Sequence, residues 1–361
     1  MKKIVSLLCA GAMLFSLAAC GSTANGDAAG ANSTAGSIVS TDTTGTTDAV
    51  TDADIAAQLA DAVTLTFSDS GITADDSGSF KTDGTALTVT GAGTYVLTGS
   101  CADGSVKVKK GVTGVTLVLD GLTLTSTNTA PITCGKSTQV VLYAAAGTEN
   151  RLADTAQNND ETYSENTDAE NAVIKCKDGS QVTLCGSGAL VIEANGKNGI
   201  KSGASTAGEG EASLTIRDVA LTISAPVNDA INAEQLLNIE SGSLTVSAGD
   251  DAIHCDLLLN IGASGADGPA ITISDCYEAI EAATLNVLSG DIDITSSDDC
   301  LNSANSDLSG YAFSMNISGG TITACSSGGD GLDSNGSLTI SGGTVAVWTA
   351  NTADNQPLDA D

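Results

Sequence analysis

The sequence predicts an all-β protein, a parallel β-helix (a solenoid of stacked coils) with a short N-terminal cap. Two observations predict this fold: a four-residue cassette that recurs through the second half, and short runs of alternating apolar residues between its copies. Each cassette has an acidic or amide residue, a small residue, Ile or Leu, and a polar residue. Its copies begin at Asn198, Asp229, Asp251, Glu278, Asp299 and Asp330. Repeats 21 to 31 residues apart are typical of coils that bury their apolar face only against their neighbours.

The strands are predicted from the alternation of Ile, Leu or Val with Thr, Ser or Asp, as in residues 221–223 and 292–294. Ser-Gly turns, such as residues 241–242, separate these short runs. One repeat holds two or three such strands and leaves no room for a helix. A leucine-rich repeat would need a Leu/Asn consensus that is absent, and a β-sandwich would not repeat one cassette in phase.

The N-terminus predicts export and a lipid anchor. Residues 1–3 are a small basic region, and residues 4–17 are an apolar stretch too short for a transmembrane helix. Residues 17–20 (Leu-Ala-Ala-Cys) match the bacterial lipobox, in which Cys20 becomes the lipidated first residue; an ordinary secretory signal with a chance Cys is the alternative. We interpret residues 1–19 as a lipoprotein signal peptide and expect the protein on the outer face of the bacterial cell membrane, held there by the lipid anchor only.

The rest of the chain divides into a linker, a cap and the β-helix. Residues 20–52 are nearly all Gly, Ala, Ser, Thr, Asn and Asp, a composition that cannot bury a core and predicts a flexible tether. In the expected cap, residues 53–80, Ile55 and Leu59 have helical spacing, so a short helix is expected to cover the open end of the solenoid. Residues 81–361 are the predicted β-helix, with roughly ten coils and a length of about 50 Å.

Two irregular segments are expected in the β-helix. The polar, acidic stretch at residues 154–168 predicts a surface loop. Residues 357–361 resemble the start of another cassette, so we expect the final coil and its cap to be incomplete.

The charge of the chain excludes some classes of partner. The formal charge is -31, and only Arg151 and Arg217 are arginines, so the protein is not expected to bind nucleic acid or anionic membrane surfaces. Bound divalent cations would relieve the repulsion between carboxylates. For acidic residues outside the cassettes we prefer the alternative to cation binding, namely that they keep an exported protein soluble.

The cysteines are predicted to be structural. Aligned on the cassette, Cys134, Cys176 and Cys255 share a position, so we expect small buried residues that stack inside the coil. A Cys134–Cys176 disulfide is the alternative. No Cys or His spacing indicates a zinc site, and His254 is the only histidine, so nothing supports a Cys-His nucleophile.

Several stretches resemble the bacterial secreted β-helix family of carbohydrate-binding domain proteins, of the clostridial cellulose- and pectin-binding, polysaccharide-lyase-like type. They are residues 93–99, 115–121, 147–150, 198–202, 277–281 and 296–299, and they extend over about residues 80–350. The resemblance implies a right-handed, single-stranded β-helix that binds calcium and acidic or cellulosic polysaccharide without a need for catalysis. The glycine usual after the acid is replaced at four cassettes, by Ala230, Ala252, Ala279 and Cys300. If that position needs a positive φ, those turns are expected to be strained.

Calcium is the cation that the cassettes predict. In stacked coils their carboxylates would lie about 4.8 Å apart and would repel one another unless a cation sat between them. Calcium takes six to eight oxygen ligands in loose geometry. The predicted ligands are Asp229, Asp250, Asp251, Glu278, Glu281, Asp298, Asp299, Asn302, Asp330 and Asp333. The alternative is a ladder of Asp and Asn side chains that accept hydrogen bonds from turn amides.

The predicted function is a non-catalytic surface module, a monomer that binds polysaccharide. An acidic, pectin-like ligand fits better than cellulose, because neutral cellulose calls for a flat row of aromatic residues and the chain has one Trp and five Tyr. Tyr277, Tyr311 and Lys201 are the candidate ligand-binding residues, whereas Trp348 is expected to be buried in the end coil.

Three other functions remain open. A calcium-dependent polysaccharide lyase would need a basic side chain to take the C5 proton, and the candidates are Lys197, Lys201 and Arg217, although acidic neighbours would hold Lys201 charged. Hydrolysis by paired carboxylates is suggested by residues 298–300 and 227–229, which look like polygalacturonase fragments. That family's Gly-His-Gly and Arg-Ile-Lys elements are absent. A structural adhesin without a sugar ligand is the third.

Overall fold

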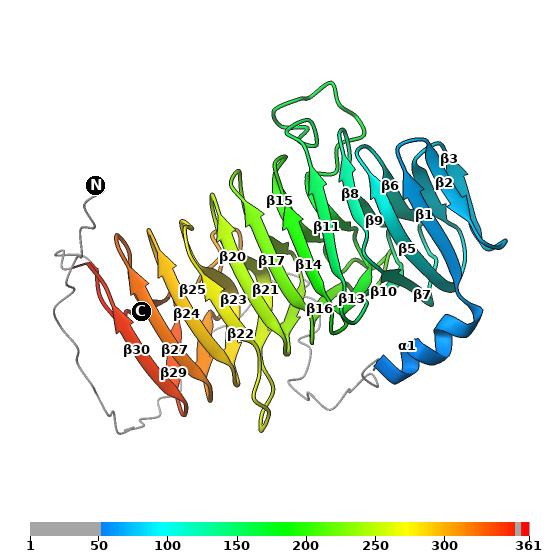
Figure 1. The fold of residues 1–361 in the computed structure, drawn as a ribbon. Coiled ribbons are helices and arrows are strands. Elements are labelled where there is room, and N and C mark those ends of the chain that lie inside the picture. Colours follow the sequence, from blue (N-terminus) through cyan, green and yellow to red (C-terminus); the bar gives the residue numbers. More distant parts are fainter. Residues whose placement is uncertain (1–51, 351–354, 361) are drawn as a thin grey trace, which may run out of the picture.

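Nearly every element is a short strand that pairs in parallel with the strands of the coils before and after it. The computed structural model describes residues 52–350 and 355–360, which form a parallel β-helix with its coils stacked along one axis (Figure 1). The predicted signal peptide, the lipidation site Cys20 and nearly all of the predicted linker lie outside the described residues. No helix in the described part of the chain is long and apolar enough to cross a bilayer.

The coils build three parallel faces. The face that carries the cassettes, here the cassette face, consists of β4 (Ala86–Val89), β6 (Ser105–Val108), β9 (Ile132–Cys134), β12 (Ala172–Cys176), β15 (Asn198–Ser202), β18 (Ile231–Ala233), the first halves of β21 (Ile253–Ile261) and β23 (Ile280–Val287), β25 (Leu301–Ser303) and β28 (Leu332–Ser334). These ten strands within the described residues agree with the roughly ten coils expected.

The other two faces complete each coil. The second face consists of β5 (Gly93–Cys101), β7 (Val115–Leu119), β10 (Gln139–Ala144), β13 (Gln181–Cys185), β16 (Ser213–Ile216), β19 (Leu236–Ile239), the second halves of β21 and β23, β26 (Ser314–Ile317) and β29 (Ser337–Ile340). The third face consists of β8 (Thr123–Ser126), β11 (Glu149–Asp154), β14 (Ala189–Glu193), β17 (Ala220–Ala225), β20 (Ser243–Ala248), β22 (Ala270–Ile273), β24 (Asp291–Ser296), β27 (Thr321–Ser326) and β30 (Thr344–Trp348).

The core is a set of columns, because the same position of every coil carries a large apolar residue. In one column the third residues of the cassettes and their counterparts pair in register: Val106, Ile132, Ile174, Ile200, Ile231, Ile253, Ile280, Leu301 and Leu332. All of them are buried. Burying one such side chain contributes about 1.5–3 kcal/mol, so these columns hold successive coils together. The predicted all-β parallel β-helix is confirmed.

The N-terminal helix exists, but it does not cover the open end of the solenoid. In α1 (Asp52–Gln58), which the short helix η1 (Leu59–Asp61) follows, the buried residue is Ile55. Ile55 packs against Val96, Val118, Tyr143 and Cys185 of the second face. Figure 1 shows α1 lying along the outside of the coils. Four successive strands, β5, β7, β10 and β13, carry apolar residues on their outer side there, and α1 covers these residues. The first coil is instead flanked by β1 (Val63–Ser68), which pairs with β5 and with the antiparallel β2 (Gly71–Ala74), and by β3 (Phe80–Asp83), antiparallel to β4.

The second position of the cassette needs a small residue for steric reasons rather than for its φ angle. None of Gly199, Ala230, Ala252, Ala279 and Cys300 has a positive φ, so the expected strain at the non-glycine cassettes is absent. A Cβ added at Gly199 would lie 2.4 Å from the carbonyl oxygen of Ala230 on the next coil. Positive φ occurs instead at the predicted Ser-Gly turns, for example at Gly242 and Gly290.

The predicted cysteine column is confirmed. Cys134 pairs with Cys176, and the column continues through Ser202 and Ala233 to Cys255. All three thiols are buried and free, so the Cys134–Cys176 disulfide is not formed. The hydrogen bond between the two thiols, together with burial, raises the pKa of Cys134. Deprotonation is therefore disfavoured, which fits a structural role.

Candidate functional site

The cassettes align along the cassette face as predicted. The backbone N–H of each second residue donates to the carbonyl of the first residue of the next cassette: Gly199 to Asp229, Ala230 to Asp251, Ala252 to Glu278, Ala279 to Asp299 and Cys300 to Asp330. The acidic first residues therefore form one continuous column. The fourth residues form a second column, through Lys201, Asn232, His254, Glu281, Asn302 and Asp333.

Side chains from the two columns reach the same side of the face. The Asn232 side-chain amide donates to Asp229 Oδ2 at 2.6 Å, and the Asn302 amide donates to Glu278 Oε2 at 3.0 Å. The first and fourth positions of neighbouring cassettes can thus contribute oxygens to one ion, as the calcium prediction requires.

The packed carboxylates oppose one another's ionisation. Burial raises the pKa of Glu278 to about 8, and the charges of Asp251, Glu281 and Asp299 add to this effect. Burial also raises the pKa of Asp251 and of Asp299 to about 6. A cation between these groups would remove the repulsion and restore their ordinary acidity.

Two further features make the coils of β23, β25 and β28 a candidate place for a cation. Asn302 is 8% exposed, and its side-chain oxygen accepts no hydrogen bond within the described residues. A Cβ at Gly329 would lie 2.3 Å from Asp298 Oδ1 and 2.4 Å from Asp299 Oδ1, so the missing side chain leaves the space that the two carboxylates occupy. An unsatisfied oxygen beside Glu278 and close-set carboxylates form an all-oxygen donor set that suits calcium.

The alternative to calcium binding was a ladder of Asp and Asn side chains that accept hydrogen bonds from backbone amides, and some of the same residues make such hydrogen bonds. Asp229 accepts hydrogen bonds at both carboxylate oxygens, from the Asn232 side chain and from the Asp251 backbone N–H. Asp299 Oδ1 accepts from the Asp330 N–H at 2.6 Å. Both carboxylate oxygens of Asp229 therefore accept hydrogen bonds from the protein itself, whereas Asp299 accepts this backbone hydrogen bond at one oxygen.

A second group of carboxylates includes Asp359, which is not among the calcium ligands predicted from the sequence. Asp330, Asp333 and Asp359 each offer an oxygen within 4.8 Å of the others. Asp359 arrives through the apparent cassette at the end of the chain, because Leu332 forms a bridge with Leu358. The resemblance of residues 357–361 to a cassette was the feature of the sequence from which Asp359 could have been predicted as a ligand.

His254 is the other residue that sequence reasoning missed. Its Nδ1 lies 2.9 Å from Asp251 Oδ2 and 3.0 Å from Glu281 Oε2, and its Nε2 lies 2.9 Å from Asp256 Oδ1. Burial alone would lower the pKa of His254, but the hydrogen bonds to Asp251, Asp256 and Glu281 outweigh it and raise the pKa. Its position in the fourth-residue column was visible in the sequence, and Asp256, two residues further along the same strand, lies on the same side of β21 by strand alternation.

The predicted aromatic contacts lie at the edge of the acidic coils. Tyr277 is 50% exposed, and a hydrogen bond to Asp298 raises the pKa of its hydroxyl to about 12. Its backbone N–H bonds to the carbonyl of Asp250, which places these residues at one corner. Tyr311 is exposed, and its ring lies 5.4 Å from that of Phe313. Trp348, expected to be buried, is only half-buried because β30 is the last strand of the third face in the described residues.

The candidate bases of a lyase are engaged by acidic or polar partners. Lys201 Nζ lies 3.1 Å from Asn232 Oδ1 and 3.5 Å from Glu234 Oε1. Lys197 forms an ion pair with Glu161. Arg217 is buried after β16 of the second face, away from the cassettes.

The N-terminal half of the cassette face carries lysines in place of acids. There the fourth-position column runs through Lys107, Thr133 and Lys175 to Lys201, and no acidic residue occupies the first position. Burial, assisted by the charge of Lys201, lowers the pKa of Lys175. Extending the cassette register toward the N-terminus would have revealed this column in the sequence.

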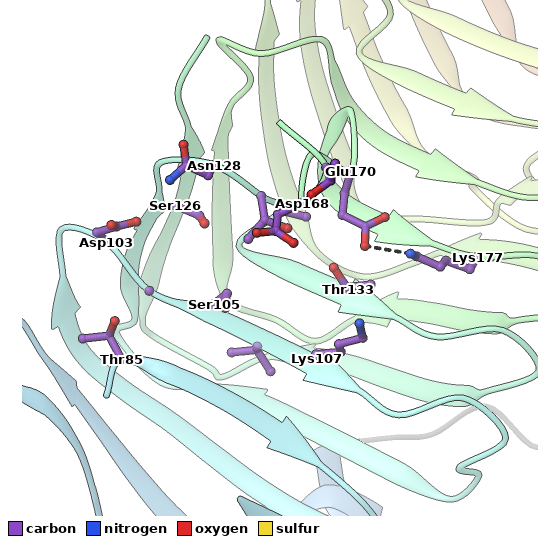
Figure 2. Close-up of a pocket in the computed structure, with 15 residues that line it drawn as sticks. Thr85, Asp103, Ser105, Lys107, Ser126, Asn128, Thr133, Asp168, Glu170 and Lys177 are labelled. Atoms are coloured by element: carbon purple, nitrogen blue, oxygen red, sulfur yellow. Dashed lines mark ion pairs between the residues drawn. The ribbon is translucent and has the colours of Figure 1, made fainter. Parts of the chain in front are cut away.

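A polar cleft of about 480 Å³ lies at this basic end (Figure 2). One wall is the irregular segment between β11 and β12, which confirms the predicted surface loop. The cleft is lined by Lys107, Asn128, Thr133, Asp168, Glu170 and Lys177 among others, and Lys177 Nζ pairs with Glu170 Oε1 at 2.7 Å. Asn158, fully buried, ties the loop to Asp154 and to the Ala172 carbonyl, so the wall is held in place.

Comparison with known proteins places the chain in a family. A family model described as carbohydrate-binding domain-containing protein matches residues 83–355. A carbohydrate-binding domain-containing protein of Acetivibrio thermocellus is 31% identical over 137 residues, which are 38% of this chain and 46% of that protein, so the match spans less than half of the relative. A solved structure, a gadolinium derivative of the polysaccharide lyase-like protein from C. thermocellum, is 20% identical with a TM-score of 0.42 and covers 83% of this chain and 99% of that chain. Because the family model covers well over half of the sequence, this chain belongs to the family of carbohydrate-binding domain-containing proteins.

Proposed function

We propose that the protein binds an acidic, pectin-like polysaccharide through calcium held by the stacked carboxylates of the cassette face, without catalysis. The observation that carries this proposal is the unsatisfied side-chain oxygen of Asn302, which is buried beside Glu278. A cation supplies what that oxygen lacks and at the same time neutralises the carboxylates around it.

Two places on the face offer oxygen ligands only. One comprises Glu278, Asp299 and Asn302, and the other comprises Asp330, Asp333 and Asp359. If each of the three residues gives one oxygen, three to five of the six to eight positions that calcium prefers stay unfilled by the protein. The remaining positions are open to water or to the carboxylates of a uronate chain, which gives calcium a bridging role.

The composition of the surface supports an anionic ligand over a neutral one. Tyr277 and Tyr311 are exposed near the acidic coils, but they are two rings rather than a continuous aromatic platform. At the other end of the same face, Lys107 points into the cleft (Figure 2), and the polar groups there can add hydrogen bonds to a saccharide. Calcium bridging and hydrogen bonding together suit a polyuronate.

The first expected result is calcium-dependent retention of the protein on insoluble polygalacturonate. We expect binding in calcium, release by chelator, and weak binding to microcrystalline cellulose in either condition. Asp330→Asn combined with Asp333→Asn is expected to weaken retention at least tenfold, because both residues belong to one group of oxygen ligands. Sedimentation of the protein with the washed polymer measures this.

The matched control is Asp291→Asn combined with Asp293→Asn, which makes the same charge change at two exposed positions of the third face. It should bind like the unmodified protein. Retention that survives chelation would reject calcium bridging, and absence of binding with and without calcium would reject the polyuronate ligand.

We further propose that the protein is exported and anchored through a lipid on Cys20, with residues 20–52 as the tether. Cys20→Ser is expected to release the protein from the membrane fraction into the medium of the cells that produce it. Fractionation followed by mass analysis of the N-terminal peptide tests this. A Cys20→Ser protein that stays with the membrane would contradict the anchor.

A further inference from the structure

The environment of His254 differs from the oxygen-only groups on the same face. Its Nδ1 faces two carboxylates, Asp251 of its own cassette at 2.9 Å and Glu281 of the next coil at 3.0 Å. The ligand atoms of these three residues all lie within 4.8 Å of one another. The side chains are well buried, with exposed fractions of 11% for Asp251, 16% for Glu281 and 20% for His254.

We propose that Asp251, His254 and Glu281 form a site for zinc, distinct from the oxygen-only calcium sites of the neighbouring coils. Calcium coordinates oxygen, whereas an imidazole nitrogen combined with carboxylates suits zinc and neighbouring transition metals. Zinc binds such ligands at about 2.0–2.2 Å and usually in tetrahedral geometry, so two of its ligand atoms lie about 3.4 Å apart. The distances from Nδ1 to the two carboxylates, 2.9 and 3.0 Å, are within about half an ångström of that spacing, so zinc would require only small side-chain shifts.

The second ring nitrogen provides an independent observation. Histidines that bind a metal through one nitrogen usually donate the other N–H to a carboxylate or carbonyl, which fixes the tautomer and the orientation of the ring. Asp256 provides this contact, with Oδ1 2.9 Å from His254 Nε2. It lies two residues after His254 on the same side of β21, and its own carbonyl accepts a hydrogen bond from the Asn305 side chain.

The next coil places a further polar group beside the site. Asn302 pairs in register with Glu281, is more than nine-tenths buried, and has a side-chain oxygen without a hydrogen-bond partner. The proposed calcium group already uses that oxygen, so the zinc site itself has three protein ligands and a fourth position open to water. Such an open position is typical of zinc sites that are not purely structural.

The competing occupant of the same space is a proton. A doubly protonated imidazole would satisfy Asp251, Asp256 and Glu281 as an ion-pair cluster, and the protein would then need no metal there. The two states differ at Nδ1, which carries a hydrogen in the ion pair and a metal in the zinc site. An experiment that observes the ring nitrogens separates them.

The test uses the untagged protein, because His254 is then the only histidine and a histidine tag would bind zinc itself. Protein freed of metal is equilibrated with zinc in a large excess of calcium, and bound metal is counted after gel filtration. We expect one zinc per chain that His254→Gln loses, with an affinity at least 100-fold lower. Asp256→Asn is expected to weaken zinc about 10- to 100-fold. The His254→Gln variant keeps every cysteine, so zinc held by thiols cannot account for the difference.

The nitrogen resonances of the single imidazole provide the second readout. Zinc should convert the ring to a form with metal at Nδ1 and hydrogen at Nε2. Equal zinc binding by the unmodified protein and His254→Gln, or a ring that stays doubly protonated in zinc, would overturn the proposal. Calcium-dependent retention on polygalacturonate should be unchanged in His254→Gln, so that failure of the zinc site and failure of the polysaccharide function are told apart.

Discussion

Glu278→Gln is expected to raise the melting temperature of the protein in chelator and to weaken calcium binding at least tenfold. The amide keeps an oxygen that can accept the hydrogen bond from Asn302, and it removes a carboxyl group that must take up a proton on folding near pH 7, because burial and the charges of Asp251, Glu281 and Asp299 raise its pKa to about 8. Calcium, which would bind the ionised carboxylate, loses a ligand by the same change. Calcium at 100 times its dissociation constant stabilises a protein by about 2.7 kcal/mol, and a tenfold weaker site loses about half of this.

Thermal unfolding followed by circular dichroism, in chelator and in calcium, measures both effects. Asp293→Asn carries the same charge change on the third face and should shift neither melting temperature appreciably. A Glu278→Gln protein that is less stable in chelator, or that responds to calcium like the unmodified protein, would mean that the carboxylate has a structural role rather than a metal-binding one.

Ile280→Ala is expected to cost about 2–5 kcal/mol of unfolding free energy, because it removes most of a side chain from the centre of the core. The side chain is fully buried, and it packs in register between Ile253 and Leu301. Truncation leaves a cavity that those two neighbours cannot fill, because each is fixed by its own coil. Since each coil is supported only by its neighbours, a weak interface in the middle of the stack can also split the unfolding transition.

Urea unfolding measures the loss, and Ile340→Ala is the matched control. Ile340 is the same residue type at the end of β29, but it is 44% exposed, so its truncation should cost no more than about 0.5 kcal/mol. Similar costs at the two positions would contradict the interpretation of the cassette column as the core that holds the coils together.

The periodic part of the fold could be predicted from the sequence, because in a solenoid the local pattern and the long-range contact are the same feature. Aligning Ile231, Ile253 and Ile280 by eye also aligns them in space, since a coil always stacks on the next. The alternation in residues 221–223 likewise predicted which side chains of β17 are buried. The first- and fourth-residue columns of the site follow from that register.

The parts that could not be predicted depend on contacts outside the repeat. The helical spacing at Ile55 is real, but whether α1 caps an end or lies along a face depends on outward apolar residues in four separate strands. Asp256 lies on the same side of β21 as His254 by strand alternation, but the register shift between Cys255 and Leu258 that follows is encoded by no cassette. The cleft forms because the loop between β11 and β12 lies over strands of earlier coils. The sequence predicts the loop, but it does not predict which strands the loop contacts.

The unequal length of the coils has a consequence for how such a protein can change. Successive members of the core column are separated by 42 residues between Ile132 and Ile174, but by only 21 between Ile280 and Leu301, and the register is kept throughout. Doubling the length of a loop costs only about 0.6 kcal/mol of closure entropy. New recognition surfaces can therefore be acquired at the corners of this scaffold by insertion, one coil at a time, while the columns inside remain as they were.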